Sequence, residues 1–439
     1  NNGDIDMETL AVTGTISLVT SGSGNATVAN TTGLKFADVR VAGNLAATAS
    51  NGAVTQRDTS GSQLGEMDID GTTTIAVSSA NDVTLDIPSN DFTGAVSITG
   101  SANDITIKDI NAINLGAVAA ARDYSVSAGG AITDSGAQVI TRAATFVTDG
   151  DLPTLTVGST SNAYEVGEII TGLSSGATGI VREGAADSTT VTYVATSGTF
   201  TTENIRGGTN SYVKVVSAVA DVTILLDHPG NSFGSINVTG NAGATINAAG
   251  AVVLTGQTLL GNLTVTAGGH VTDTGTWDVT GMTTITARDG GGTDYDVTLG
   301  GAADDFKGAV SITGANVVIT DENSIVLGKT AASGFLTVTA GASGGTLGTV
   351  TQSSLAAAKN LAVTGATTIT GTDITLNNTA NNFQGAVGVT TRGSDVVLVD
   401  TNAIELGAST VTGTYDVTAG GAVTQSGALA ITGATTITA

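Results

Sequence analysis

The sequence predicts an all-β protein built as a parallel β-helix, a solenoid whose coils have about 25 residues, with one small inserted β module. Three observations lead to this prediction. Near-copies of the string NDFTGAVSITG recur along the chain, and short runs alternate aliphatic residues with hydroxyl or charged ones. Gly, Asn, Asp and Ser separate these runs, as expected at the corners of a solenoid.

The repeated string marks equivalent positions along the chain. Its copies are NDFTGAVSITG (90–100), NSFGSINVTG (231–240), DDFKGAVSITG (304–314) and NNFQGAVGVTT (381–391). The aromatic residues that these copies place in register are Phe92, Phe233, Phe306 and Phe383. We expect each Phe to fill a structural corner. A glycine-rich run, typified by YDVTAGGAVTQSG (415–427), recurs with the same unit of about 75 residues.

The runs between turns have the period of strands with one buried face. VSIT, DITIKDI, YSVSA and GAIT alternate aliphatic and polar residues, whereas helical periodicity is nearly absent. Paired hairpin signals are also scarce, which favours coils stacked in parallel. Stacking places equivalent residues about 4.8 Å apart, so the interior favours small and medium aliphatic side chains.

The composition agrees with a narrow aliphatic core and limits the partners. The 439 residues include 61 Gly, 3 Pro and no Cys, and only 3% are aromatic. Without Cys, the chain can form neither disulfides nor thiolate sites. The net charge of −24 opposes binding to nucleic acid and to anionic lipid. No apolar run is long enough to span a membrane, so we expect no direct membrane insertion.

An excess of about 65 residues interrupts the repeat once. We therefore predict a solenoid over 1–146, an inserted small all-β module over 147–220, and a continuing solenoid over 221–439 that extends beyond the given sequence. Within the insertion, residues 164–181 and 200–216 echo each other at an offset of 36. The run VGEIITGLSSGATGIV is similar to small β units of phage virion and bacterial surface proteins.

The insertion is the best candidate for specific recognition. It is rich in Tyr and carries basic residues, and the candidate recognition residues are Tyr164, Tyr193, Arg206 and Tyr212. The alternative is that these aromatic side chains form the core of the module.

No motif points to catalysis, and no cofactor is predicted. The sequence lacks a nucleophile elbow, a zinc-protease motif and a phosphate loop. Calcium at the Asp-rich turns 101–109, 288–296 and 320–323 is an alternative, because calcium takes carboxylate and carbonyl oxygens. The GGxGxD repeat of calcium-binding β-rolls is absent, and Asn and Asp also occur at turns without an ion. We therefore expect a protein that is not an enzyme.

The blocks GAVSITGSANDITIKDINAINLG (94–116) and YDVTAGGAVTQSG resemble the repeats of filamentous-haemagglutinin-like exoproteins. These are large repetitive bacterial adhesins exported by two-partner secretion. The resemblance covers nearly everything except the insertion, and the family's N-terminal secretion motif is not visible. It implies an internal shaft region with a right-handed β-helix, located in the extracellular space or on the outer cell surface. It also implies a role in adhesion, aggregation or biofilm, through glycans or proteins of host or neighbouring cells or through self-association.

Two alternatives belong to other functional classes. One is a self-assembling extracellular structural protein, such as an S-layer or a fibre. The other is a phage tail fibre or spike that binds glycans, which we would expect to form a trimer.

Overall fold

The structure, a computed structural model, describes residues 3–56, 65–78, 80–149, 154–157, 164–166, 168–183, 190–197, 200–209, 213–220, 223–341, 347–353, 360–391 and 394–439. None of these residues lies in a helix. The predicted fold class is confirmed, because the strands form a parallel β-solenoid of stacked coils. The chain divides into two compact units, Asn1–Ala248 and Ala249–Ala439.

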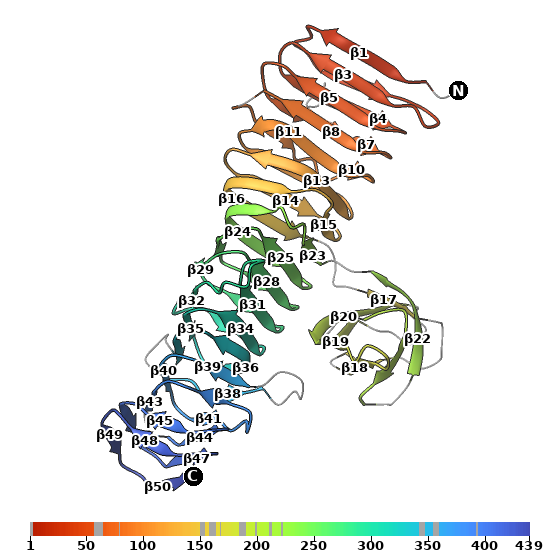
Figure 1. Ribbon diagram of the computed structural model, residues 1–439. Coiled ribbons are helices and arrows are strands. Elements are labelled where there is room, and N and C mark those ends of the chain that lie inside the picture. The colour runs from red at the N-terminus through yellow and green to blue at the C-terminus, as the bar shows by residue number, and fades with distance from the viewer. Residues whose placement is uncertain are drawn as a thin grey trace. The chain divides into compact units, whose positions relative to one another are not determined.

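The first unit contains a solenoid of short strands (Figure 1). Its strands are β1 (Ile5–Leu10), β2 (Ile16–Val19), β3 (Ala26–Asn30), β4 (Leu34–Val41), β5 (Leu45–Ala49), β6 (Val54–Gln56), β7 (Met67–Ile69), β8 (Thr73–Val77), β9 (Val83–Leu85), β10 (Asp91–Phe92), β11 (Val96–Ala102), β12 (Ile105–Asp109), β13 (Ile113–Ala120), β14 (Tyr124–Ala128), β15 (Ile132–Asp134), β16 (Gln138–Thr148), β23 (Ile224–Leu226), β24 (Ser232–Gly240) and β25 (Ala244–Ala248). All pairings among these strands are parallel, and Figure 1 shows β1, β3, β5 and β8 stacked in order.

A coil is shorter than the 25 residues that the sequence predicted. Across β12 to β16, the residues Ile105, Ile113 and Val118 pair with Tyr124, Ile132 and Gln138, which are shifts of 19, 19 and 20 residues. Each coil thus contributes three strand segments, one to each face. Loops lengthen some coils, as between Leu45 and Thr73, which pair at a shift of 28 residues.

The core consists of columns of aliphatic side chains, one from each coil. Ile107 pairs with Leu85 on one side and Val126 on the other, and all three are fully buried. Strands such as β12 alternate buried and half-buried positions, so every second side chain joins such a column. Because each inward position has a neighbour above and below at about 4.8 Å, Val, Ile, Leu and Ala fill it without voids.

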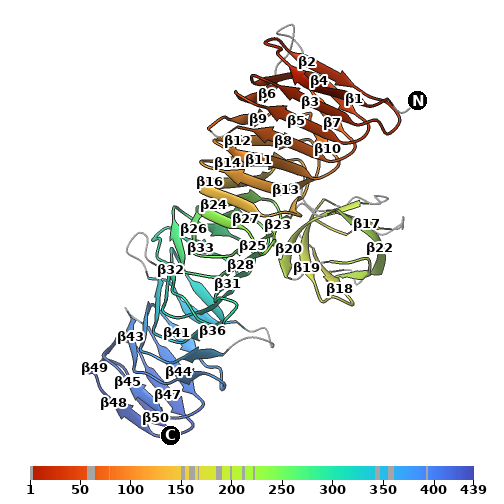
Figure 2. The same cartoon turned by 45° about the horizontal axis from the view of Figure 1, so that its top comes forward.

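The first unit also contains a closed six-stranded barrel of antiparallel strands (Figure 2). Its strands are β17 (Thr154–Val157), β18 (Ile169–Gly172), β19 (Thr178–Glu183), β20 (Thr190–Ser197), β21 (Asn204–Gly207) and β22 (Val213–Ala220), joined in the order β17-β20-β19-β18-β21-β22. They lie within the segment 147–220, where the sequence predicts an inserted all-β module. Closure of the barrel removes free sheet edges.

The second unit is a solenoid of the same kind. Its strands are β26 (Val252–Thr255), β27 (Thr258–Leu259), β28 (Leu263–Ala267), β29 (Val271–Thr274), β30 (Asp278–Val279), β31 (Thr283–Ala287), β32 (Val297–Leu299), β33 (Asp305–Phe306), β34 (Val310–Gly314), β35 (Val317–Asp321), β36 (Ile325–Ala332), β37 (Leu336–Ala340), β38 (Val350–Gln352), β39 (Leu361–Val363), β40 (Thr367–Gly371), β41 (Ile374–Leu376), β42 (Asn382–Phe383), β43 (Val387–Thr391), β44 (Val396–Asp400), β45 (Ile404–Leu406), β46 (Ser409–Val411), β47 (Tyr415–Ala419), β48 (Val423–Gln425), β49 (Leu429–Ile431) and β50 (Thr435–Thr438).

Equivalent Phe residues of successive repeats do not stack in one column. In the second unit, Phe383 pairs with Val363, which pairs with Ala332, which in turn pairs with Gly314 of β34. Phe306 lies instead on the preceding strand, β33. The first unit behaves in the same way, because the column of Phe233 leads to β11, the strand after Phe92. Successive repeats are therefore rotated by one strand segment around the coil.

Candidate functional site

A polar corner surrounds the repeated Phe, which is 0–3% exposed in the four copies. In the first copy the backbone N–H of Phe92 donates to Asp109 Oδ2 at 2.8 Å, and the N–H of Asn111 donates to Asp109 Oδ1 at 2.8 Å. The Asn111 side chain donates to Asp91 Oδ1 at 3.1 Å. One buried carboxylate thus ties the Phe strand to the following coil.

The same arrangement returns in both copies of the second unit. The corresponding groups are Phe306 and Asn323 bonded to Asp321, and Phe383 and Asn402 bonded to Asp400. Burial raises the pKa of Asp109 and of Asp321 to about 6, although the backbone hydrogen bonds act in the opposite direction. The Phe233 copy differs, because Ala248 ends its equivalent strand.

The glycine that follows the Phe is required by close approach of the preceding coil. A Cβ atom on Gly94 would lie 2.4 Å from the carbonyl oxygen of Gly71, and one on Gly308 would lie 2.2 Å from that of Gly281. Atoms at such distances overlap, so only glycine fits at these two corners.

A second polar contact lies inside the coil at the residue two positions before each Phe. Asn90 is 0% exposed and exchanges two hydrogen bonds with Gln56 of the preceding coil, at 2.7 and 3.0 Å. Its Oδ1 also accepts the N–H of Met67 at 3.1 Å. The equivalent pairs are Asn381 with Gln352 and Asn231 with Asp134. In each of these pairs an amide N–H meets an oxygen.

The third copy brings two carboxyl groups together at this position. Asp304 replaces the Asn and Asp273 replaces its partner. Asp304 is 0% exposed, and its Oδ1 accepts the backbone N–H of Trp277 at 3.2 Å. Its Oδ2 is buried and has no hydrogen-bond partner. Burial and then the nearby charge of Asp273 raise the pKa of Asp304 to about 7.

The Asp-rich turns considered for calcium are internally bonded. Asp109 and Asp321 accept backbone N–H groups, as described above. In the turn 288–296, Asp294 pairs with Arg288 at 2.5 Å, and Asp289 accepts the N–H groups of Gly291 and Thr293. Within the described part of the chain, no three His, Cys, Asp or Glu side chains gather in a way that could hold a metal ion.

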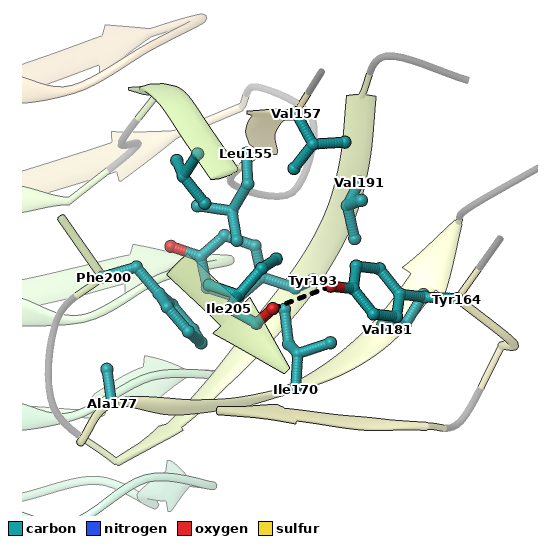
Figure 3. Close-up of a cluster of buried hydrophobic side chains, with 11 residues drawn as sticks. Leu155, Val157, Tyr164, Ile170, Ala177, Val181, Val191, Tyr193, Phe200 and Ile205 are labelled. Carbon is teal, nitrogen blue, oxygen red and sulfur yellow. Dashed lines mark hydrogen bonds between the residues drawn. The ribbon is translucent and has the colours of Figure 1, made fainter. Parts of the chain in front are cut away.

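Two of the predicted recognition residues lie in the core of the barrel. Tyr164 is 1% exposed and Tyr193 is 4% exposed, and the Tyr164 hydroxyl donates to the carbonyl oxygen of Ile205 at 3.0 Å (Figure 3). The Tyr193 ring packs edge-on against Phe200. These tyrosines therefore cannot contact a partner directly, because the barrel needs them to fill its interior. Arg206 is exposed, and Tyr212 lies outside the described residues.

The barrel consists of two similar halves related by a shift of 35 residues, one less than the sequence echo suggested. The register pairs Ile170 with Gly207 and Gly172 with Ile205, which is symmetric under that shift. A buried glutamate in each half caps a turn of the other half. These contacts are Glu203 with the N–H groups of Ser174 and Ser175, and Glu168 with the N–H of Thr209.

The outward side of the barrel carries an aliphatic face. The face consists of exposed residues on and next to β18, β21 and β22: Ile169, Leu173, Arg206, Val213 and Val215. The strand register places Arg206 between Thr171 and Val213. The outward positions of these three strands carry no acidic side chain, which is unusual in a chain with 38 acidic and 14 basic residues.

The comparisons with known proteins address the repeats. Residues 23–99, 102–164, 239–313, 314–390 and 393–439 match the family described as "Repeats of unknown function (DUF5649)", which is more than half of the chain. The chain belongs to this repeat family. No curated protein and no solved structure matches it.

The DUF5649 repeats share the architecture described above. The two matched segments 239–313 and 314–390 each contain one Phe corner and the strands of several coils. The unmatched stretch 165–238 contains β18 to β22, most of the barrel. The described residues include no helix long and apolar enough to cross a membrane.

Sequence reasoning missed the buried carboxylates of the polar corners. Asp109 and Asp400 follow the pattern of solvated turn residues, and their burial depends on the neighbouring coil. The recurrence of Asp-x-Asn after the Phe string, at 109–111, 321–323 and 400–402, was the available signal. A pattern shared by three repeats indicates a shared contact more strongly than it indicates a solvated turn.

Proposed function

We propose that the protein is a non-enzymatic shaft, located on the outer cell surface or secreted, that displays a binding module and supports adhesion, aggregation or biofilm. Filamentous-haemagglutinin-like adhesins exported by two-partner secretion have this role. Two features support the proposal. The repeats form solenoids that bury their own polar groups, and one compact barrel interrupts them.

The aliphatic face of the barrel is the observation that carries the proposal. Five of the ten exposed large hydrophobic side chains among the described residues belong to the barrel segment: Val166, Ile169, Leu173, Val213 and Val215. Clustered exposed aliphatic residues next to one cation are typical of protein-binding surfaces. A partner surface with apolar side chains and a carboxylate would complement Arg206.

No reaction is assigned to the protein. The buried carboxylates of the corners are occupied by backbone N–H groups, so they are poorly placed to exchange protons with a substrate. Partners are proposed to be proteins or glycans of host or neighbouring cells, or further copies of the chain. Nucleic acid and direct membrane insertion are not proposed, because a net charge of −24 opposes contact with polyanions.

Adhesion by substituted protein tests the proposal. Beads carrying the full chain are compared with beads carrying the double variant Arg206→Glu and Val215→Asp in binding to bacterial and epithelial cells. We expect at least a tenfold loss of bound cells and an unchanged melting temperature, since both positions are exposed. The matched control is Val19→Asp, because Val19 is 69% exposed on the solenoid strand β2. Equal adhesion by all three proteins would refute the role of the barrel.

The two other functional classes give different results in solution. A fibre or S-layer protein would form ordered polymers visible by electron microscopy. A tail spike would give a stable trimer by light scattering, three times the chain mass of 42.8 kDa. The proposed shaft does neither at micromolar concentration.

A further inference from the structure

The four copies of the internal polar contact differ in the hydrogen atoms that they supply. Asn90 and Gln56 each offer an N–H and a carbonyl oxygen, so both hydrogen bonds between them are complete. At the third copy, Asp304 and Asp273 present only carboxyl groups. Two ionised carboxylates provide acceptors and no donor, so they cannot reproduce this contact.

The remaining atoms of the site do not provide the missing donor. Asp304 Oδ1 accepts the N–H of Trp277, and the Asp273 oxygens accept the N–H groups of Gly300 and Gly301 at 2.8 and 3.3 Å. Asp304 Oδ2 is buried without a partner, and the two carboxyl groups lie within hydrogen-bonding reach of each other. A buried polar atom without a partner costs about 1–3 kcal/mol.

We propose that Asp304 and Asp273 share one proton at neutral pH, and that loss of this proton as the pH rises loosens the coil around Trp277. The shared proton supplies the hydrogen that the amide supplies in the other copies. The inference concerns the solenoid and does not depend on the binding role of the barrel.

The charged groups around the pair do not replace the proton. They are Asp278 on β30, Asp305 and Lys307 at β33, and Asp321 and Glu322 at the end of β35. Lys307, the one cation among them, is bound to Asp278 and Asp305. The acidic neighbours favour retention of a proton by Asp304. The backbone N–H of Glu322 donates to the carbonyl oxygen of Asp304 and leaves its carboxyl group untouched.

The direction of the pH dependence follows from proton binding. Burial and the charge of Asp273 raise the pKa of Asp304 from 3.8 to about 7, so the folded chain holds the proton more tightly than the unfolded chain. Between these two values the folded state binds more protons, and stability falls as the pH rises. Above about pH 7 both states are deprotonated, and the loss is complete.

Trp277 is the only tryptophan in the chain and reports directly on this site. Its side chain is 1% exposed, and its ring lies 5.3 Å from that of Phe306. The full chain is titrated from pH 5 to 9 in EDTA while tryptophan emission and the melting temperature are followed. We expect an emission change with a midpoint near pH 7 and a lower melting temperature at pH 8 than at pH 5.5.

Asp304→Asn should remove both effects, because the resulting pair matches Asp134 with Asn231, which the chain already contains. The control is Asp305→Asn, which should retain both effects. The last repeat has Asn382 at the position of Asp305, and its Oδ1 accepts a bond from Asn402. The proposal is overturned if the wild-type emission shows no transition, or if Asp304→Asn leaves the transition in place. A transition that appears only when EDTA is omitted would also overturn it, since a metal ion would then hold the pair.

Discussion

At the scale of single residues, the polar corners explain why the repeat contains a Phe next to acidic and amide side chains. The ring fills the interior at a point where a strand is only two residues long, as in β10, β33 and β42. Such a strand makes few ladder hydrogen bonds of its own. The following Asp compensates by accepting the N–H of the Phe, and one carboxylate therefore stabilises both the turn and the aromatic side chain.

Truncation of the Phe should be costly and local. Phe306→Ala should lower the free energy of unfolding by about 3–5 kcal/mol, the usual range for a buried Phe, and shift Trp277 emission because the two rings are in contact. Urea unfolding followed by tryptophan fluorescence measures both effects. Phe335→Ala serves as the control, since Phe335 is 41% exposed and should cost little. Similar losses in both variants would mean that Phe306 does not support the corner.

At the scale of elements, the barrel and the solenoid are stabilised in different ways. The solenoid adds identical layers, whereas the barrel closes around one aromatic cluster that includes Tyr164, Tyr193 and Phe200. Each half of the barrel depends on a glutamate from the other half, so neither half can order its turn alone. The aliphatic face is supported by this reciprocal bonding, because Leu173 precedes the Ser174 and Ser175 N–H groups that Glu203 binds.

The capping glutamate predicts acid sensitivity of the barrel. Burial alone would raise the pKa of Glu203, but hydrogen bonds from Ser175, Ser174 and Thr201 outweigh it and lower the pKa from 4.5 to about 2. The stabilisation is therefore present above about pH 4.5 and is lost as the pH falls toward 2. Pepsin should cleave the barrel progressively faster across this window.

Substitution of the glutamate tests this explanation. Glu203→Gln should be cleaved at a rate that changes little between pH 4.5 and 2, apart from the pH profile of pepsin itself, which an unstructured peptide calibrates. Glu165→Gln, at an exposed position, should behave like the wild type. A wild-type barrel with constant resistance down to pH 2 would contradict the assignment.

At the scale of the whole molecule, rotation of the repeats determines how surface features are distributed. Within each unit, an outward residue that occurs once per repeat moves to the next face in the following repeat. Single-repeat features therefore do not form a stripe along one face, which would be needed for binding a flat periodic surface. A separate module such as the barrel avoids this constraint, because it presents its whole face at one place.

Pyrene labels can trace the column that connects successive repeats. Since the chain has no Cys, pairs of Cys introduced at outward positions can be labelled selectively. The register places Asn382 on Ala362, Ala362 on Ala331 and Ala331 on Thr313, each about 4.8 Å apart. We expect pyrene excimer emission for these three pairs and weak emission for Thr313 with Ala362, two coils apart. Failure of any of the three pairs would contradict the rotation.

The sequence by itself determined the β-solenoid, the repeat and the segment that holds the barrel. Alternating aliphatic residues, turn residues and a period of about 75 are local signals, and they are visible because each coil repeats the same chemistry. The core role of the four Phe residues was also foreseeable, since a rare aromatic residue at a fixed place needs a fixed space. Arg206 was the one predicted recognition residue that the structure places at the surface, among those it describes.

Only the tertiary structure decided the length of the coil, the rotation of the repeats and the burial of Asp109, Asp304 and Tyr164. These properties depend on which residue of the next coil, or of the other half of the barrel, lies opposite. Strand pairing across 19 or 20 residues leaves no mark in the local pattern, because a shift by a few residues within a turn preserves the alternation. The physical reason is that a carboxylate or a tyrosine looks the same in sequence whether water or a neighbouring coil surrounds it.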